Sequence, residues 1–311
     1  MSRISLIRFV SLGLIWGTSY TFIKLADGGL TPSQVVLGRL LVGMVTLLVI
    51  IRIGRVRLPA FGRVWAHFCV TAVLGMVAPF LLLAWSEQYA SAAMAGVLIA
   101  SLPLCTLAAV TVLLPAERAG LQKIGGLLTG FAGVAVIFAP WQSHIGSLGG
   151  QFAVLGAAAC YAMQTVYIRK FLSPRGIPAL ALAAAQLMVA VVLQAVITPA
   201  LPWHAPHMTW KVIVSVLALG ALGSAVAYTL YFRLIADLGA TTASTVNYLV
   251  PVVAITASVV LLSDTVTWNM LCGVALVLVG LAFAERRIPV PRIHRRVVSA
   301  DAAIQREESP V

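Results

Sequence analysis

The chain is divided into ten continuous apolar runs, and this pattern constrains its fold more than any other feature. An α-helix needs about 20 mostly apolar residues to cross the hydrocarbon core of a bilayer. Strands of a membrane barrel would instead alternate apolar and polar residues over about ten positions. The sequence therefore predicts an all-α polytopic membrane protein with ten transmembrane helices: Phe9–Leu25, Gln34–Ile51, Val64–Trp85, Ala90–Leu114, Leu121–Ala139, Phe152–Ile168, Ala179–Thr198, Val212–Leu234, Ala240–Leu262 and Trp268–Ala284.

Composition excludes a water-soluble fold. Hydrophobic residues make up 61% of the chain and charged residues 10%, whereas soluble domains have about 45–50% and about 25%. The links between the runs are short, so no separate soluble domain is expected. The first run lacks a small-residue cleavage site within reach and is expected to remain as an uncleaved span.

The positive charges form a topology signal. The net charge of +12 does not indicate a nucleic-acid partner, because the basic residues lie in short clusters between the apolar runs. With the N-terminus in the cytoplasm, eighteen Lys and Arg residues lie on the cytoplasmic side and two, Lys24 and Lys211, on the other. This bias predicts a cytoplasmic-membrane protein with both termini inside. The basic tail, 286–311, is expected to be disordered and to lie near anionic lipids.

The two halves of the chain resemble each other. Pro103 and Pro251 lie within the fourth and ninth runs, 148 residues apart. Five spans are an odd number, so the second unit must enter the membrane inverted, as in many secondary transporters. We expect units at 1–145 and 146–285, with the two prolines as hinges. Three further pairs are each 147 residues apart: Glu117 and Asp264, Gly126 and Gly273, Gly133 and Gly280.

Several motifs resemble those of a known family. They lie in the opening of the first span, at the start of the second and at the entry to the fifth: Trp16-Gly17-Thr18-Ser19-Tyr20-Thr21-Phe22-Ile23-Lys24, Thr31-Pro32, Arg39-Leu40-Leu41, and Glu117 with Gly125-Gly126 and Gly133. These motifs are similar to those of EamA-type members of the drug/metabolite transporter superfamily. The family often has Gly where this chain has Ala116 and Ser263. Over Leu6–Glu285, the resemblance implies ten helices in a five-plus-five inverted repeat and export of amino acids or related metabolites.

Polar and aromatic residues within the spans are the candidate substrate site. Such residues are costly to expose to lipid and suit recognition of a zwitterion with an apolar side chain. For Arg39, a structural role and contact with a substrate carboxylate remain equal alternatives. The predicted cavity residues are Trp16, Ser19, Tyr20, Arg39, Ser101, Tyr161, Gln164, Tyr228, Tyr231, Asn247 and Tyr248.

The acidic residues all lie at the ends of the predicted spans or beyond them. Proton-driven carriers commonly use a carboxylate within the membrane, so the sequence favours facilitative transport or coupling without a buried carboxylate. Neither a catalytic motif nor a metal-ligand or cofactor pattern is present, and no enzyme activity, metal or cofactor is expected. The alternatives are a channel, or a carrier of drugs, sugars or nucleotide-sugars.

The fifth and tenth spans contain glycines but no polar cluster. Gly126 and Gly130 have the spacing of a helix-packing motif. We expect these two helices at the periphery, each packed on its own repeat. Their glycine face is one candidate contact for a weak homodimer of an otherwise monomeric protein.

Overall fold

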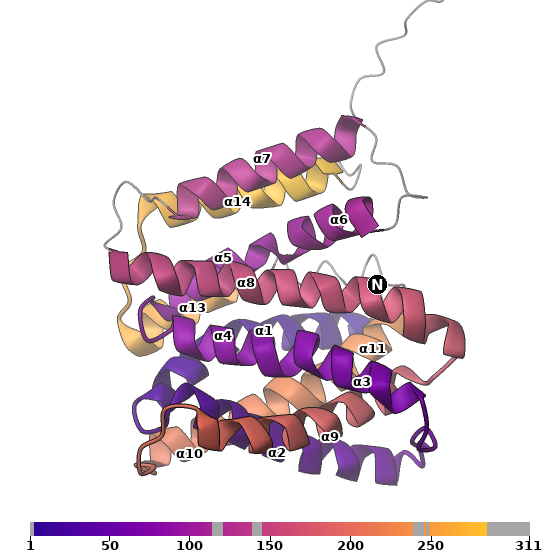
Figure 1. Ribbon diagram of the computed structural model, residues 1–311. Helices are drawn as coiled ribbons and strands as arrows, with labels where there is room; N and C mark the ends of the chain where they lie inside the picture. The colour runs from indigo at the N-terminus through magenta and orange to yellow at the C-terminus, as the bar shows by residue number, and fades with distance from the viewer. Residues whose placement is uncertain (1–2, 114–120, 139–144, 239–245, 247–248, 285–311) are drawn as a thin grey trace, which may run out of the picture.

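A computed structural model describes residues 3–113, 121–138, 145–238, 246 and 249–284. All of its regular elements are helices, and no strand occurs in these ranges, as the sequence predicts. Figure 1 shows them side by side across one bundle. The elements are α1 (Arg3–Asp27), α2 (Pro32–Ile53), α3 (Val64–Ala72), η1 (Val73–Val77), α4 (Ala78–Ser86), α5 (Ala92–Leu98), η2 (Ile99–Ser101), α6 (Leu102–Leu113), α7 (Leu121–Phe138), α8 (Ile145–Tyr167), η3 (Ile168–Leu172), η4 (Ser173–Arg175), α9 (Ala179–Ile197), η5 (Thr198–Ala200), α10 (Trp210–Leu217), η6 (Ala218–Val226), α11 (Ala227–Leu238), α13 (Leu249–Leu262) and α14 (Trp268–Ala284).

Six continuous helical stretches are long and apolar enough to cross a membrane: Arg3–Asp27, Pro32–Ile53, Val64–Ser86, Leu148–Arg175, Ala179–Ala200 and Trp210–Tyr231. Four shorter apolar helices occupy the places of the other predicted spans, at Ala92–Thr106, Ile124–Ile137, Leu249–Leu262 and Trp268–Gly280. The protein is therefore a multi-pass membrane protein, and the count of ten spans stays a prediction.

The start of α2 shows how local sequence fixes a helix end. The Thr31 hydroxyl accepts a hydrogen bond from the Gln34 backbone N–H, and the Gln34 side chain accepts one from the Thr31 N–H. Pro32 begins the helix, where its missing N–H costs nothing. This reciprocal cap satisfies two backbone donors that would otherwise be unpaired.

The first helices of the two halves, α1 and α8, run in opposite directions. Arg8, early in α1, forms an ion pair with Asp237 at the end of α11. The Tyr167 hydroxyl, at the end of α8, is hydrogen-bonded to His67 near the start of α3. In Figure 1, the beginnings of α1 and α3 and the ends of α8 and α11 lie towards the right-hand side, so α1 begins where α8 ends. We call this the basic end. The segments that meet there contain Arg3, Arg8, Arg52, Arg55, Arg57, Arg63, Arg169, Lys170, Arg175 and Arg233. At the opposite end, α1 and α4 end and the α13–α14 loop lies; these segments contain Asp27, Glu87 and Asp264, and we call this the acidic end.

Helix contacts are repeated when the two halves are exchanged. In one set, α1 packs against α13 and α2 against η6; in the other, α8 packs against α6, and α9 against α3 and η1. α2 and α9 contact each other, as do α5 and α13. The core is therefore built between the halves rather than within each one.

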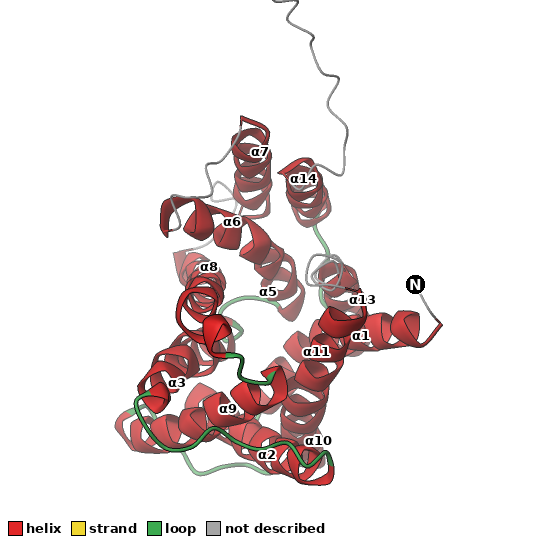
Figure 2. Ribbon diagram, turned by 90° about the vertical axis from the view of Figure 1, so that its right-hand side faces the viewer, coloured by secondary structure: helices red, strands yellow, loops and turns green. Residues whose placement is uncertain are grey.

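The packing of α7 and α14 differs from the prediction. Each was expected to pack on its own repeat, but they pack mainly against each other, side by side at the top of Figures 1 and 2. A Cβ on Gly133 would lie 2.8 Å from the Gly273 carbonyl oxygen, and one on Gly280 2.5 Å from the Gly130 nitrogen. Glycines on both helices permit this approach, so the glycine face of α7 is covered by α14 and is unavailable for a dimer contact.

Two helices contain a π-helical segment at matching places in the repeat. η1 interrupts the α3–α4 helix around Gly75, and η6 interrupts α10–α11 around Gly223, 148 residues later. Pro79, absent from the predicted hinges, follows η1 in the first turn of α4. Pro103 follows the 3-10 turn η2, and Pro251 lies in the first turn of α13. π segments often occur at functional sites. In this protein, η1 and η6 both lie beside the cavity described below.

Candidate functional site

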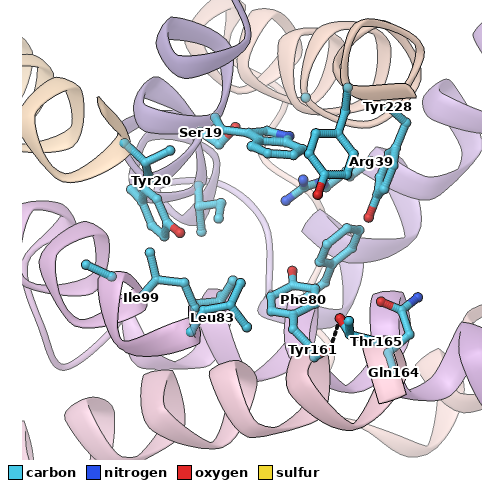
Figure 3. Close-up of a pocket in the computed structure, with 17 residues that line it drawn as sticks. Ser19, Tyr20, Arg39, Phe80, Leu83, Ile99, Tyr161, Gln164, Thr165 and Tyr228 are labelled. Atoms are coloured by element: carbon cyan, nitrogen blue, oxygen red, sulfur yellow. Dashed lines mark hydrogen bonds between the residues drawn. The ribbon is translucent and has the colours of Figure 1, made fainter. Parts of the chain in front are cut away.

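A cavity of about 210 Å³ lies at the centre of the bundle, between the two halves of the chain. Its wall includes residues of α1, α2, α4, α6, α8, α11 and α13. Figure 3 shows the side chains converging on one space. The cavity is smaller than the roughly 300–1,000 Å³ of pockets for drug-sized ligands, which favours a small metabolite.

One wall is aromatic. The Trp16 ring centroid lies 6.4 Å from that of Tyr228 and 5.4 Å from that of Tyr231, at interplanar angles of 75° and 51°. Tilted and edge-to-face pairs of this kind stabilise each other beyond their buried area. Trp16 comes from α1 and the tyrosines from α11, so the wall joins the two repeats.

Arg39 supplies the positive charge of the cavity. Its side chain is 7% exposed, and its Nε donates to the Ser224 hydroxyl at 3.1 Å. The guanidinium lies 3.8 Å above the Phe80 ring. Among the described residues that line the cavity, Arg39 is the one charged residue, and none is a carboxylate. Guanidinium groups in general pair with carboxylates through two charge-assisted hydrogen bonds.

Gln164 lies across the cavity from the aromatic wall. Its Nε2 donates to the Thr71 carbonyl at 3.2 Å and to Gln186 Oε1 at 2.9 Å. The absence of a side chain at Gly75 leaves room for the Gln164 amide, because a Cβ there would lie 1.7 Å from Gln164 Nε2. The amide is therefore fixed between α3, η1 and α9, in the wall of the cavity.

The polar cluster around Arg39 and the polar cluster around Gln164 and Gln186 are related by the internal repeat. Gln186 follows Arg39 by 147 residues, and Gly223 follows Gly75 by 148. A Cβ on Gly223 would lie 3.2 Å from Ser19 Oγ, so a polar side chain approaches each π segment. The same scaffold holds a cation in one half and a neutral amide in the other.

Most of the predicted site residues surround this one cavity. Ser101 does not line it; that side chain is buried at the end of η2, next to Leu102, which does. Asn247 and Tyr248 lie outside the described residues. Those lining the cavity are Trp16, Ser19, Tyr20, Arg39, Tyr161, Gln164, Tyr228 and Tyr231.

Sequence analysis missed Phe80, Gln186 and Ser224, which hold the cavity's polar groups in place. The repeat offset would have indicated Gln186, since that residue is the counterpart of Arg39. Nothing in the local sequence distinguishes Phe80 or Ser224 from other apolar or small residues of their helices. Only the fold places them against Arg39.

Comparison with known proteins agrees with the resemblance. The chain is 26% identical over 283 residues to the uncharacterized transporter YvbV of Bacillus subtilis, covering 89% of this chain and 90% of that protein. It is 26% identical over 282 residues to the WAT1-related protein At3g02690, chloroplastic, of Arabidopsis thaliana, covering 88% and 67%.

A solved structure described as "Crystal structure of protein" superimposes with a TM-score of 0.65 at 19% identity, covering 93% of this chain and 100% of that one. At this identity the similarity shows the fold alone. The profile of the EamA-like transporter family matches residues 3–139 and again residues 148–285. These two matches cover most of the chain, which therefore belongs to the EamA-like transporter family.

Proposed function

We propose that this transporter is an alternating-access carrier that exports amino acids, including neutral and aromatic ones, across the cytoplasmic membrane. The observation that carries the proposal is Arg39, the one charge among the described residues of the cavity wall. Its guanidinium would bind the substrate carboxylate, and the aromatic wall formed with Trp16 would hold an apolar or aromatic side chain.

Neutral groups would bind the substrate ammonium. The Gln164 side-chain oxygen can accept a hydrogen bond, and the face of Trp16 can hold a cation. A zwitterion then brings one negative charge to Arg39 and leaves the site with a net charge of one, as before binding. The basic end would face the cytoplasm, following the positive-inside rule.

The test is counterflow in proteoliposomes loaded with a panel of neutral, aromatic and charged amino acids, polyamines and sugars. We expect saturable counterflow of amino acids and none of their decarboxylated amines. Preference for sugars or polyamines would replace the amino-acid assignment with another substrate class. Non-saturable flux without counterflow would indicate a channel.

A further inference from the structure

The acidic end contains a buried carboxyl group that the cavity chemistry does not use. Glu87 follows the last residue of α4, where its position in the sequence predicts a solvated side chain. Its exposed fraction is instead 0%, and neither carboxyl oxygen has a hydrogen-bond partner among the described residues. A carboxylate removed from water without donors is costly, and such a group takes up a proton instead.

The surrounding charges strengthen this conclusion. Glu87 interacts electrostatically with one ammonium, that of Lys24, and with two other carboxyl groups, those of Asp27 and Asp264. The Lys24 ammonium donates to the backbone carbonyls of Glu87 and Ala90, not to a carboxylate.

The other two acids have donors of their own. Asp27 accepts from the Gln88 side chain at 3.3 Å, and Asp264 accepts from the Ser258 hydroxyl and from the Ala93 N–H. Glu87 is therefore the carboxyl group of this set that has no hydrogen-bond donor among the described residues. Burial raises its pKa well above the usual range, with Asp27 and Asp264 adding to the rise and Lys24 opposing it. From α1 and α2, Tyr20 and Arg39 also interact with it electrostatically.

Glu87 lies at the acidic end, close to the cavity. Leu83 and Tyr20 line the cavity, and Glu87 and Lys24 each lie four residues further along the same helices, or about 6 Å of helix rise. The contacts described above join the end of α1, the α4–α5 loop and the α13–α14 loop across this end. An opening that admits substrate from the acidic end must separate them and admit water to Glu87.

We propose that Glu87 is a proton-binding site that keeps the acidic end of the cavity closed when neutral and favours opening when ionised. The inference rests on the proposed carrier function, because it assigns a gate to the same cavity. Any ligand that binds one conformation more tightly shifts the population toward it, and here that ligand is a proton.

The direction of the pH effect follows from linkage. In the open state Glu87 is hydrated and has an ordinary pKa of about 4.3, whereas the closed state has the raised value. Proton binding therefore stabilises the closed state fully below the ordinary pKa, and this stabilisation is lost as pH rises through the raised pKa. Within that window, each pH unit shifts the equilibrium toward opening by up to about tenfold.

The first measurement is infrared spectroscopy of the purified protein. We expect wild type at neutral pH to show the carbonyl stretch of a protonated carboxylic acid. The band should be absent from Glu87→Gln and retained in Asp237→Asn, which alters an exposed acid at the basic end. Absence of the band from folded wild type at neutral pH overturns the proposal. If the band disappears when the choline of the buffer is replaced by sodium, Glu87 binds sodium, and this result also overturns the proposal.

The second measurement is counterflow with equal pH on both sides, from about pH 5.5 to about pH 8. Wild-type exchange should rise severalfold with pH, whereas Glu87→Gln should exchange slowly and without this slope. The same slope in Glu87→Gln as in wild type overturns the gate but leaves the carrier function intact. Failure of wild type to exchange any substrate overturns the carrier function, while the infrared result still decides whether Glu87 holds a proton. If Glu87→Gln does not fold, Glu87→Asp and the wild-type infrared titration provide the test.

Discussion

The Arg39 cluster and the Gln186 cluster occupy equivalent places in the two repeats and differ in charge. In the first, Arg39 of α2 bonds to Ser224 within η6. In the second, Gln186 of α9 accepts a hydrogen bond from the Gln164 side chain, which also donates to the Thr71 carbonyl just before η1. The backbone framework is duplicated, so the difference in charge between the two clusters comes from their side chains alone. One cluster presents a cation, Arg39, and the other presents only neutral amides, Gln164 and Gln186.

The largest effect is expected from Arg39→Gln, which gives position 39 the residue type of its repeat counterpart, Gln186. Loss of a charge-assisted contact costs about 1.5–3 kcal/mol, so KM for amino acids should rise roughly 10- to 100-fold. Uptake kinetics and thermal unfolding in detergent would measure flux and folding. Arg39→Lys retains the charge without the paired geometry and should be intermediate. Unchanged KM in Arg39→Gln would leave Arg39 with a structural role only.

The next effect concerns the glycines that admit a polar side chain beside each π segment. In Gly75→Ala the new Cβ would displace the Gln164 amide, whose Nε2 is 1.7 Å away; Gly223→Ala requires only a small shift of Ser19 Oγ, 3.2 Å away. We expect Gly75→Ala to lower flux by roughly tenfold, as one or two hydrogen bonds are lost, and Gly223→Ala to stay close to wild type.

A double-mutant cycle tests the mechanism of the Gly75→Ala effect. If that substitution acts through Gln164, Gln164→Ala alone and the double variant should have the same flux. Additive losses would show that the glycine matters for a different reason, such as helix packing. Equal losses in Gly75→Ala and Gly223→Ala would remove the proposed difference between the clusters.

The smallest effect is expected in Gln186→Leu. Gln186 is 2% exposed and does not line the cavity, but its Oε1 accepts from Gln164. Loss of one neutral hydrogen bond costs about 1 kcal/mol, so flux should fall by roughly fivefold through a less well-fixed Gln164. Substrate titration would show the change in KM. Full wild-type kinetics would mean that Thr71 alone positions the amide.

The amino-acid sequence by itself determined the class of this protein. Continuous apolar runs leave an α-helix as the structure that satisfies every backbone group in lipid, and the repeat offset is legible without coordinates. Most of the predicted cavity residues do share one space, because polar and aromatic groups within apolar helices avoid lipid and face the interior.

Only the tertiary structure decided what those residues contact. The pairing of α7 with α14, the contacts of Arg39 with Phe80 and Ser224, and the burial of Glu87 each depend on helices far apart in the chain. Position along a helix tells how deep a residue lies, but solvent exposure depends on neighbouring loops and helices. Glu87 lies at a helix end, where the sequence predicts contact with water. The packing of the acidic end instead excludes water from this side chain.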